Sequence, residues 1–148
     1  MNKRHPITAF YVEALILILA FVGIILVLTQ VFGAGQALSS DADQLTRAVG
    51  LAQNTAEAVA AAEDFEDLSD IMEEGQVGGS ADPEGIWNYY DKDGNPSEDG
   101  VYHVWTTWEP EPKGEGELIR SKITVQYGDE KEPIYTLETA KYREEGSE

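Results

Sequence analysis

The chain contains no cysteine and only two histidines, His5 and His103. The missing cysteines exclude disulfide bonds and thiolate metal sites. With so few imidazoles, and no serine or cysteine motif that could complete a nucleophilic constellation, we expect no enzyme activity and no cofactor.

Positive charge is also scarce. The 148 residues include 10 Lys+Arg against 28 Asp+Glu, a formal net charge of −18, and most of the acidic residues follow residue 60. An anionic surface repels phosphate backbones, so we expect no direct binding of nucleic acid. The length suffices for one compact domain with an anchor, but not for two full domains.

A long apolar run lies near the N-terminus. From Ala14 to Leu28 every residue is apolar or glycine, and residues 9–32 together reach the roughly 20 residues that a membrane span requires. The apolar core of a signal peptide has only about 7–15 residues, so we predict an uncleaved transmembrane helix at 9–32 after a leader at 1–8. Because Lys3 and Arg4 precede the span, the positive-inside rule places the N-terminus in the cytoplasm and the rest outside the cell membrane.

Glu13 is the one charged residue inside this apolar segment. A charged group at the centre of a span costs about 3 kcal/mol, and less toward an end. Two interpretations follow. Either Glu13 reaches the lipid headgroups and has no further role, or its carboxylate meets a positive partner inside a protein assembly.

An amphipathic helix is predicted to continue the membrane helix over residues 33–62. Apolar residues recur there at alternating spacings of four and three, at Leu38, Ala42, Leu45, Val49, Ala52, Ala56 and Val59. We expect this stripe to pack on the protein's own sheet. A coiled coil between subunits is the alternative, although the small Ala-rich stripe would give it a thin seam.

The sequence after residue 62 predicts an acidic connector at 63–85 and a sheet domain at 86–148. The connector contains one short helix, spaced by Phe65, Leu68, Ile71 and Met72, and then a loop at 75–85. Four strands are predicted by period-two patterning and turn residues, at Ile86–Tyr90, Val101–Trp108, Leu118–Tyr127 and Ile134–Tyr142, with a charged loop at 109–117. The fold class is therefore α+β: a long helix packed on an antiparallel four-stranded sheet.

Two rival sites lie in the sheet domain. Asp91, Asp93, Asn95, Ser97 and Asp99 occupy alternate positions, which imitates a calcium loop, but Pro96 and Tyr102 stand where such a loop has Gly and Glu. An ordinary hairpin turn explains this segment better. The tryptophans Trp87, Trp105 and Trp108 could form a ligand-stacking surface, although filling of the core is the simpler interpretation.

The chain resembles type IV pilins, and among them the minor pilins and the pseudopilins of type II secretion and competence systems. The resemblance rests on AFYVEALILILAFVGIILVLTQ, LTRAVGLAQNTAEA and SKITVQYGDEKEPIYTLETAKY. Family members usually carry Gly before the cleavage point, Phe first in the mature chain and Glu fifth. With Ala9 first, Glu13 is fifth but Thr8 replaces the glycine; with Phe10 first, Ala9 precedes the cut but Glu13 is fourth.

The resemblance implies that Glu13 pairs with the N-terminal ammonium of a neighbouring subunit and fixes axial register. It also implies other pilin or pseudopilin subunits, an inner-membrane platform protein, an assembly ATPase and a prepilin peptidase as partners. The alternative from another class is a stand-alone, single-pass membrane-anchored module that binds a ligand outside the cell membrane.

Overall fold

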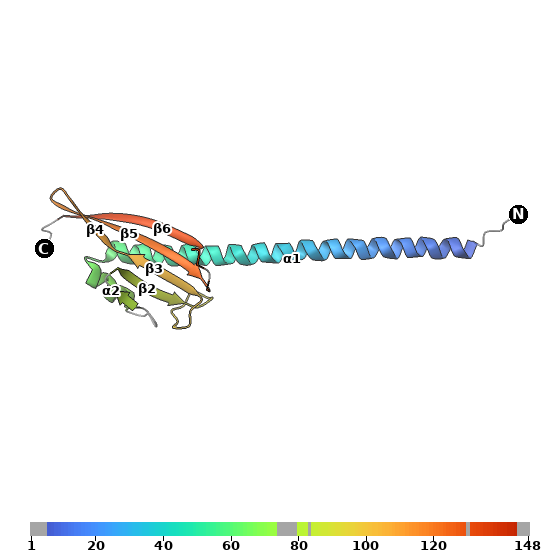
Figure 1. Cartoon of the computed structure of the whole chain (residues 1–148), viewed down its shortest axis with the longest axis horizontal. Helices are drawn as coiled ribbons and strands as arrows, with labels where there is room; N and C mark the ends of the chain where they lie inside the picture. The colour runs from blue at the N-terminus through green and yellow to red at the C-terminus, as the bar shows by residue number, and fades with distance from the viewer. Residues whose placement is uncertain (1–5, 74–79, 83, 130, 145–148) are drawn as a thin grey trace. The chain divides into compact units, whose positions relative to one another are not determined.

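The computed structural model describes residues 6–73, 80–82, 84–129 and 131–144. Two helices are followed by six strands (Figure 1). Their bounds are α1 Pro6–Ala61, α2 Phe65–Glu73, β1 Ser80–Asp82, β2 Gly85–Tyr90, β3 Tyr102–Thr107, β4 Glu109–Lys113, β5 Gly116–Tyr127 and β6 Tyr135–Glu144. The predicted α+β class, with a long N-terminal helix ahead of an antiparallel sheet, is confirmed.

The chain divides into two units, Met1–Ala42 and Asp43–Glu148, so the boundary falls within α1. In the first unit the described residues, 6–42, all belong to α1 and include its apolar segment. The second unit holds the last turns of α1, the short helix α2 and all six strands.

The sheet is an antiparallel meander in which β5, the longest strand, pairs with three others. β1 pairs with β2, β2 with β3, and β5 with β3, β4 and β6. β3 and β4 run along the same side of β5 in one register, because Tyr102 lies opposite Tyr127 and Lys113 opposite Gly116. Together, β3 and β4 therefore occupy one strand position beside β5. Their pairing with β5 is interrupted at Thr107 and Trp108.

The prediction of four strands was incomplete at two places. β4 lies at 109–113, within the segment predicted as a charged loop, and β1 lies at 80–82, within the predicted loop 75–85. Pro110 and Pro112 in β4 suggested a loop because proline lacks an N–H group. They are accommodated because β4 pairs only with β5, so alternate residues can turn their nitrogen atoms toward the open edge.

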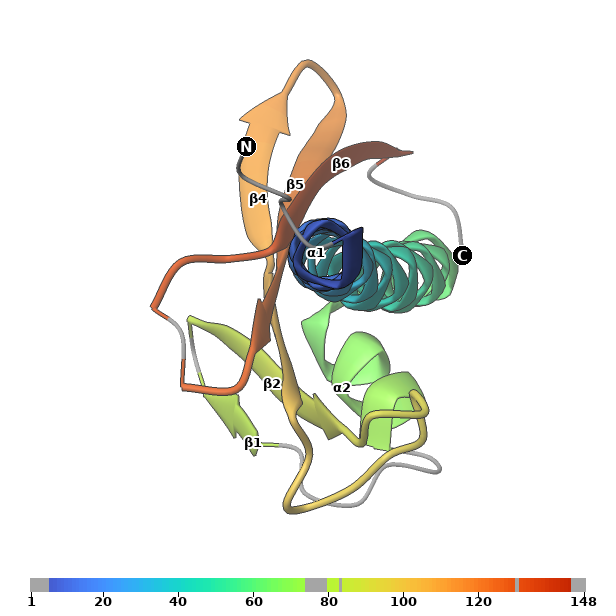
Figure 2. The same ribbon diagram turned by 90° about the vertical axis from the view of Figure 1, so that its right-hand side faces the viewer.

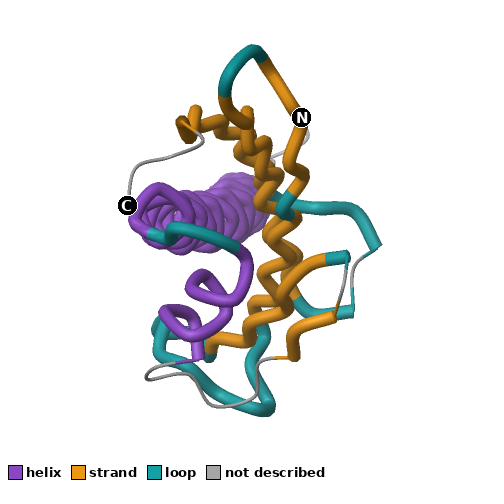
Figure 3. The backbone as a smooth tube through the Cα atoms, turned by 90° about the vertical axis from the view of Figure 1, so that its left-hand side faces the viewer, coloured by secondary structure: helices purple, strands orange, loops and turns teal. Residues whose placement is uncertain are grey.

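The last turns of α1 pack with α2 on one face of the sheet (Figures 2 and 3). One apolar cluster joins α1 to the middle of the sheet through Ala48, Leu51, Ala52, Tyr90, Tyr102, Val104, Ile123 and Val125. A second cluster joins the end of α1 to α2 through Val59, Ala62, Leu68, Met72 and Ile86. Packing of this helix segment on the protein's own sheet is thus confirmed.

The face that α1 buries differs from the predicted stripe at several positions. Leu45 is 46% exposed, whereas Ala48, Leu51 and Thr55 are buried. Ala52 and Val59 are buried as predicted. Small residues at the contact, such as Ala48 and Ala52, allow the helix backbone to approach the sheet closely. The size of an apolar side chain therefore does not predict whether its position on α1 is buried against the sheet.

Acidic side chains connect α1 to α2. The carboxylate of Asp64 accepts the N–H of Asp67 at 2.8 Å, and the carboxylate of Asp67 accepts the N–H of Glu63 at 2.7 Å. This reciprocal pattern satisfies amide groups that the start of a helix leaves without partners. The predicted short helix is confirmed as α2, with Leu68 and Met72 on its buried side.

Candidate functional site

The apolar part of α1 is exposed along its whole length. Every large apolar side chain from Phe10 to Phe32 is at least 46% exposed, and none of this apolar segment is buried within the protein. A surface of this kind is costly in water and favourable in lipid. This helix is long and apolar enough to span a membrane, as a single-pass membrane protein requires.

Glu13 lies within this exposed apolar surface, on the second turn of the described helix. The candidate cleavage positions Thr8, Ala9 and Phe10 also lie inside α1, which begins at Pro6. Lys3 and Arg4, from which the orientation was predicted, fall outside the described residues. The predicted roles of all six residues remain predictions.

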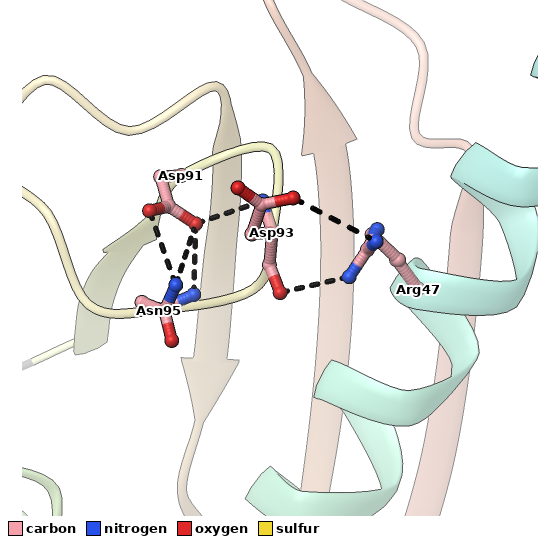
Figure 4. A network of polar contacts seen from close by, with 4 residues as sticks. All are labelled: Arg47, Asp91, Asp93 and Asn95. Carbon is pink, nitrogen blue, oxygen red and sulfur yellow. Dashed lines mark hydrogen bonds and ion pairs between the residues drawn. The ribbon is translucent and has the colours of Figure 1, made fainter.

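The loop between β2 and β3 is attached to α1 by Arg47 (Figure 4). The Arg47 guanidinium donates to the carbonyl oxygen of Asp93 at 2.8 Å, and it lies 3.9 Å from the Asp93 carboxylate. Asp91 organises the same loop, because its carboxylate accepts the backbone N–H groups of Asp93 and Asn95 at 2.8 and 2.9 Å. These hydrogen bonds, first of all that from the Asn95 N–H, hold the pKa of Asp91 below its ordinary value.

This geometry is that of a turn stabilised by an aspartate side chain. Gly94, with a φ of 85°, supplies the left-handed residue that the turn needs. Among the described residues, no group of three or more His, Asp and Glu side chains is placed so that it could hold a metal ion. The calcium assignment to Asp91, Asp93, Asn95, Ser97 and Asp99 remains a prediction.

Two cations of β6 lie at the C-terminal end of α1. Lys141 Nζ donates to the carbonyl oxygen of Ala62, and Arg143 donates to that of Glu63 at 2.5 Å. Cations are favourable there because the last carbonyls of a helix are unpaired and partly negative. Lys141 Nζ also lies 4.9 Å from the centre of the Trp108 ring. Burial and the neighbouring Arg143 lower the pKa of Lys141.

The three tryptophans divide between the two faces of the sheet. Trp108 packs against the second apolar cluster, on the side of the helices, as the core interpretation expects. Trp87 and Trp105 alternate with the buried residues of β2 and β3, so they lie on the opposite face and belong to neither core cluster. His103 lies on that face too, and its Nε2 donates to the carbonyl of Gly100 at 3.1 Å.

Buried polar side chains cross the helix-facing side of the sheet. Asn88, Thr106 and Ser121 are at most 2% exposed, and their side-chain polar atoms have no hydrogen-bond partner among the described residues. Such groups cost free energy when no partner replaces water. They lie on β2, β3 and β5 as successive diagonal neighbours.

A hollow of about 290 Å³ lies beside the interruption between β3 and β4. Its lining carries charges of both signs, from Glu109, Arg120, Lys122 and Glu138. The mixture selects neither an anion nor a cation, so the hollow does not indicate a ligand class.

Comparison of the chain with protein-family models, with curated proteins and with solved structures finds no match.

Proposed function

We propose that the chain is a minor pilin-like or pseudopilin-like structural subunit of a type IV pilus, a competence filament or a type II secretion-like filament. The observation that carries this proposal is the make-up of α1. One helix joins an exposed apolar segment with a single carboxylate, Glu13, to final turns that pack on an antiparallel sheet.

The role of Glu13 follows from its cost in lipid. A carboxylate in an apolar span is stabilised when a positive group neutralises it, and a free N-terminal ammonium of a neighbouring chain would supply that charge. Breaking such a buried pair leaves an uncompensated charge, so assembly would depend strongly on this one side chain.

Orientation and processing belong to the same proposal. The N-terminus lies in the cytoplasm and the acidic sheet domain lies outside the cell membrane. A prepilin peptidase cuts before Ala9 or before Phe10. N-terminal sequencing of the protein extracted from membranes distinguishes these two positions, and a chain that keeps residues 1–8 would show that the leader is retained.

The missing cysteines allow a direct test in native membranes. A single Ile16→Cys substitution places one thiol on the apolar segment, one turn after Glu13. A photo-activated cross-linker attached to this thiol through a maleimide is expected to join this chain to neighbouring subunits of similar size, whether or not they contain cysteine. Adding Glu13→Ala should reduce the cross-linked fraction about ten-fold or more, because roughly 1.4 kcal/mol already corresponds to a factor of ten.

The matched control is Glu57→Ala, which removes an exposed carboxylate from the sheet-packed part of the same helix. This change should leave cross-linking unchanged. A chain that gives no cross-links, or equal cross-linking with and without Glu13, would contradict the filament proposal.

A further inference from the structure

Four rings form a contiguous patch on the face of the sheet opposite α1, as two pairs across the strands, Trp87 with Trp105 and Tyr89 with His103. We call these four residues the aromatic patch. The ring centres of Trp87 and Trp105 are 4.8 Å apart, those of Trp87 and Tyr89 are 6.5 Å apart, and those of Tyr89 and His103 are 5.1 Å apart. The planes of Trp87 and Tyr89 differ by only 7°. All four residues are half-buried, so part of each remains accessible to solvent.

Gly85 makes room for the Trp105 ring on the sheet. A Cβ atom at position 85 would lie 2.7 Å and 2.8 Å from two atoms of the indole. Trp105 therefore rests directly on the backbone of β2, as an aromatic ring does when it covers a glycine in a neighbouring strand. Resting one side of the indole on the strand leaves the other side available for contact with a ligand.

The residues of β5 that pair with the aromatic patch are polar but uncharged. Trp105 pairs with Thr124, and His103 pairs with Gln126, on β5. These side chains offer a hydroxyl and an amide beside the rings. The His103 Nε2 atom already donates to Gly100, which makes Nδ1 the acceptor in the neutral imidazole. In a chain of net charge −18, these paired positions contain no Asp, Glu, Lys or Arg.

We propose that the aromatic patch is a binding site for a neutral glycan. A pyranose ring presents C–H groups on one face and hydroxyl groups around its rim. The C–H groups match the negative face of an indole or phenol ring, and the hydroxyls match the amide, hydroxyl and imidazole groups beside it. The acidic chain repels anionic polymers, including nucleic acid, and the positions paired with the rings carry no carboxylate that would hold a cation, so these features favour an uncharged ligand. This site does not depend on filament assembly.

The test uses the full chain in phosphocholine micelles, which carry no sugar. The probes are two neutral hexasaccharides, one of glucose and one of N-acetylglucosamine, and binding is followed by calorimetry and by tryptophan fluorescence. We expect saturable binding of at least one hexasaccharide. Trp87→Thr should weaken it about ten-fold or more, because stacking on an aromatic ring contributes on this scale. Threonine suits a half-buried strand position, so the sheet should be retained.

Trp108→Phe is the matched control, because it changes a tryptophan on the helix-facing side and should leave the affinity unchanged. Tyr89→Ala is a second test variant, should Trp87→Thr lower the unfolding midpoint. Failure to bind either hexasaccharide would overturn the proposal, as would equal binding by wild type and by a folded variant of the aromatic patch. Tighter binding of heparin or single-stranded DNA than of the hexasaccharides would overturn it as well.

Discussion

Replacing Thr106 with valine should make the sheet-containing unit more stable. Thr106 is 0% exposed, and its hydroxyl has no hydrogen-bond partner among the described residues. Its neighbours across the strands are Ile86 and Ile123, which suit a methyl group. Valine has the same branched shape, so the change exchanges a hydroxyl for a methyl without opening a cavity.

The magnitude follows from the cost of a buried hydroxyl. An unsatisfied buried polar group costs about 1–3 kcal/mol, and we expect Thr106→Val to raise the free energy of unfolding by about that amount. For a domain of roughly 100 residues, each kcal/mol raises the unfolding midpoint by about 4–8 °C. The three tryptophans, at positions 87, 105 and 108, all lie in the sheet-containing unit. Their fluorescence therefore follows its unfolding in the full chain in micelles.

The neighbouring Thr107 provides a control of opposite sign. Its hydroxyl accepts the N–H of Lys122 at 3.1 Å where the ladder between β3 and β5 is interrupted. Thr107→Val removes this bond and should lower the free energy of unfolding by about 0.5–1.5 kcal/mol. If Thr106→Val lowered stability as well, the reasoning would be refuted, and a buried water bound to the Thr106 hydroxyl would be the explanation.

Three further changes probe the packing of the second unit and its loop. Leu68→Ala, at a side chain that is 0% exposed, should cost about 2–5 kcal/mol in chemical denaturation, and a loss below 1 kcal/mol would contradict its place in the core. Arg47→Ala removes an exposed contact to Asp93, so stability should fall by about 1 kcal/mol or less while proteolysis of the loop at 91–100 accelerates; unchanged cleavage would argue against the attachment. The lowered pKa of Asp91 stabilises the fold above its unfolded pKa of about 3.9, and this contribution is lost as the pH falls through the folded value. Asp91→Asn should therefore flatten the acid side of the stability profile, and an unaltered profile would oppose this assignment.

Local patterning predicted the strands where apolar and polar residues alternate. In β5, Ile119, Ile123 and Val125 are buried while Arg120 and Lys122 are exposed, as the period of two requires. β4 escaped prediction because all five of its residues are exposed and two are prolines. It is a strand because the hairpin with β5 holds it, and local propensity carries no signal of that pairing.

The contacts of the candidate sites were less predictable than the fold. Arg47 and Asp93 are 46 positions apart in sequence, and Lys141 is 79 positions from the carbonyl that it reaches, so no spacing rule joins them. The placement of Trp87 and Trp105 could have been read from the alternation of IWNYY with VYHVWTTW. Trp108 lies on the other face, so the number of aromatic residues alone could not decide between a core and a surface location for the tryptophans.

The two prolines of β4 affect how copies of the domain behave when they are crowded together. Chains tethered side by side to one surface meet at high local concentration, where a bare strand edge recruits its copies into continuous sheets. Prolines at every second position leave that rim without the amide hydrogens that such growth requires. This rim of the domain can therefore stay close to its neighbours without fusing to them.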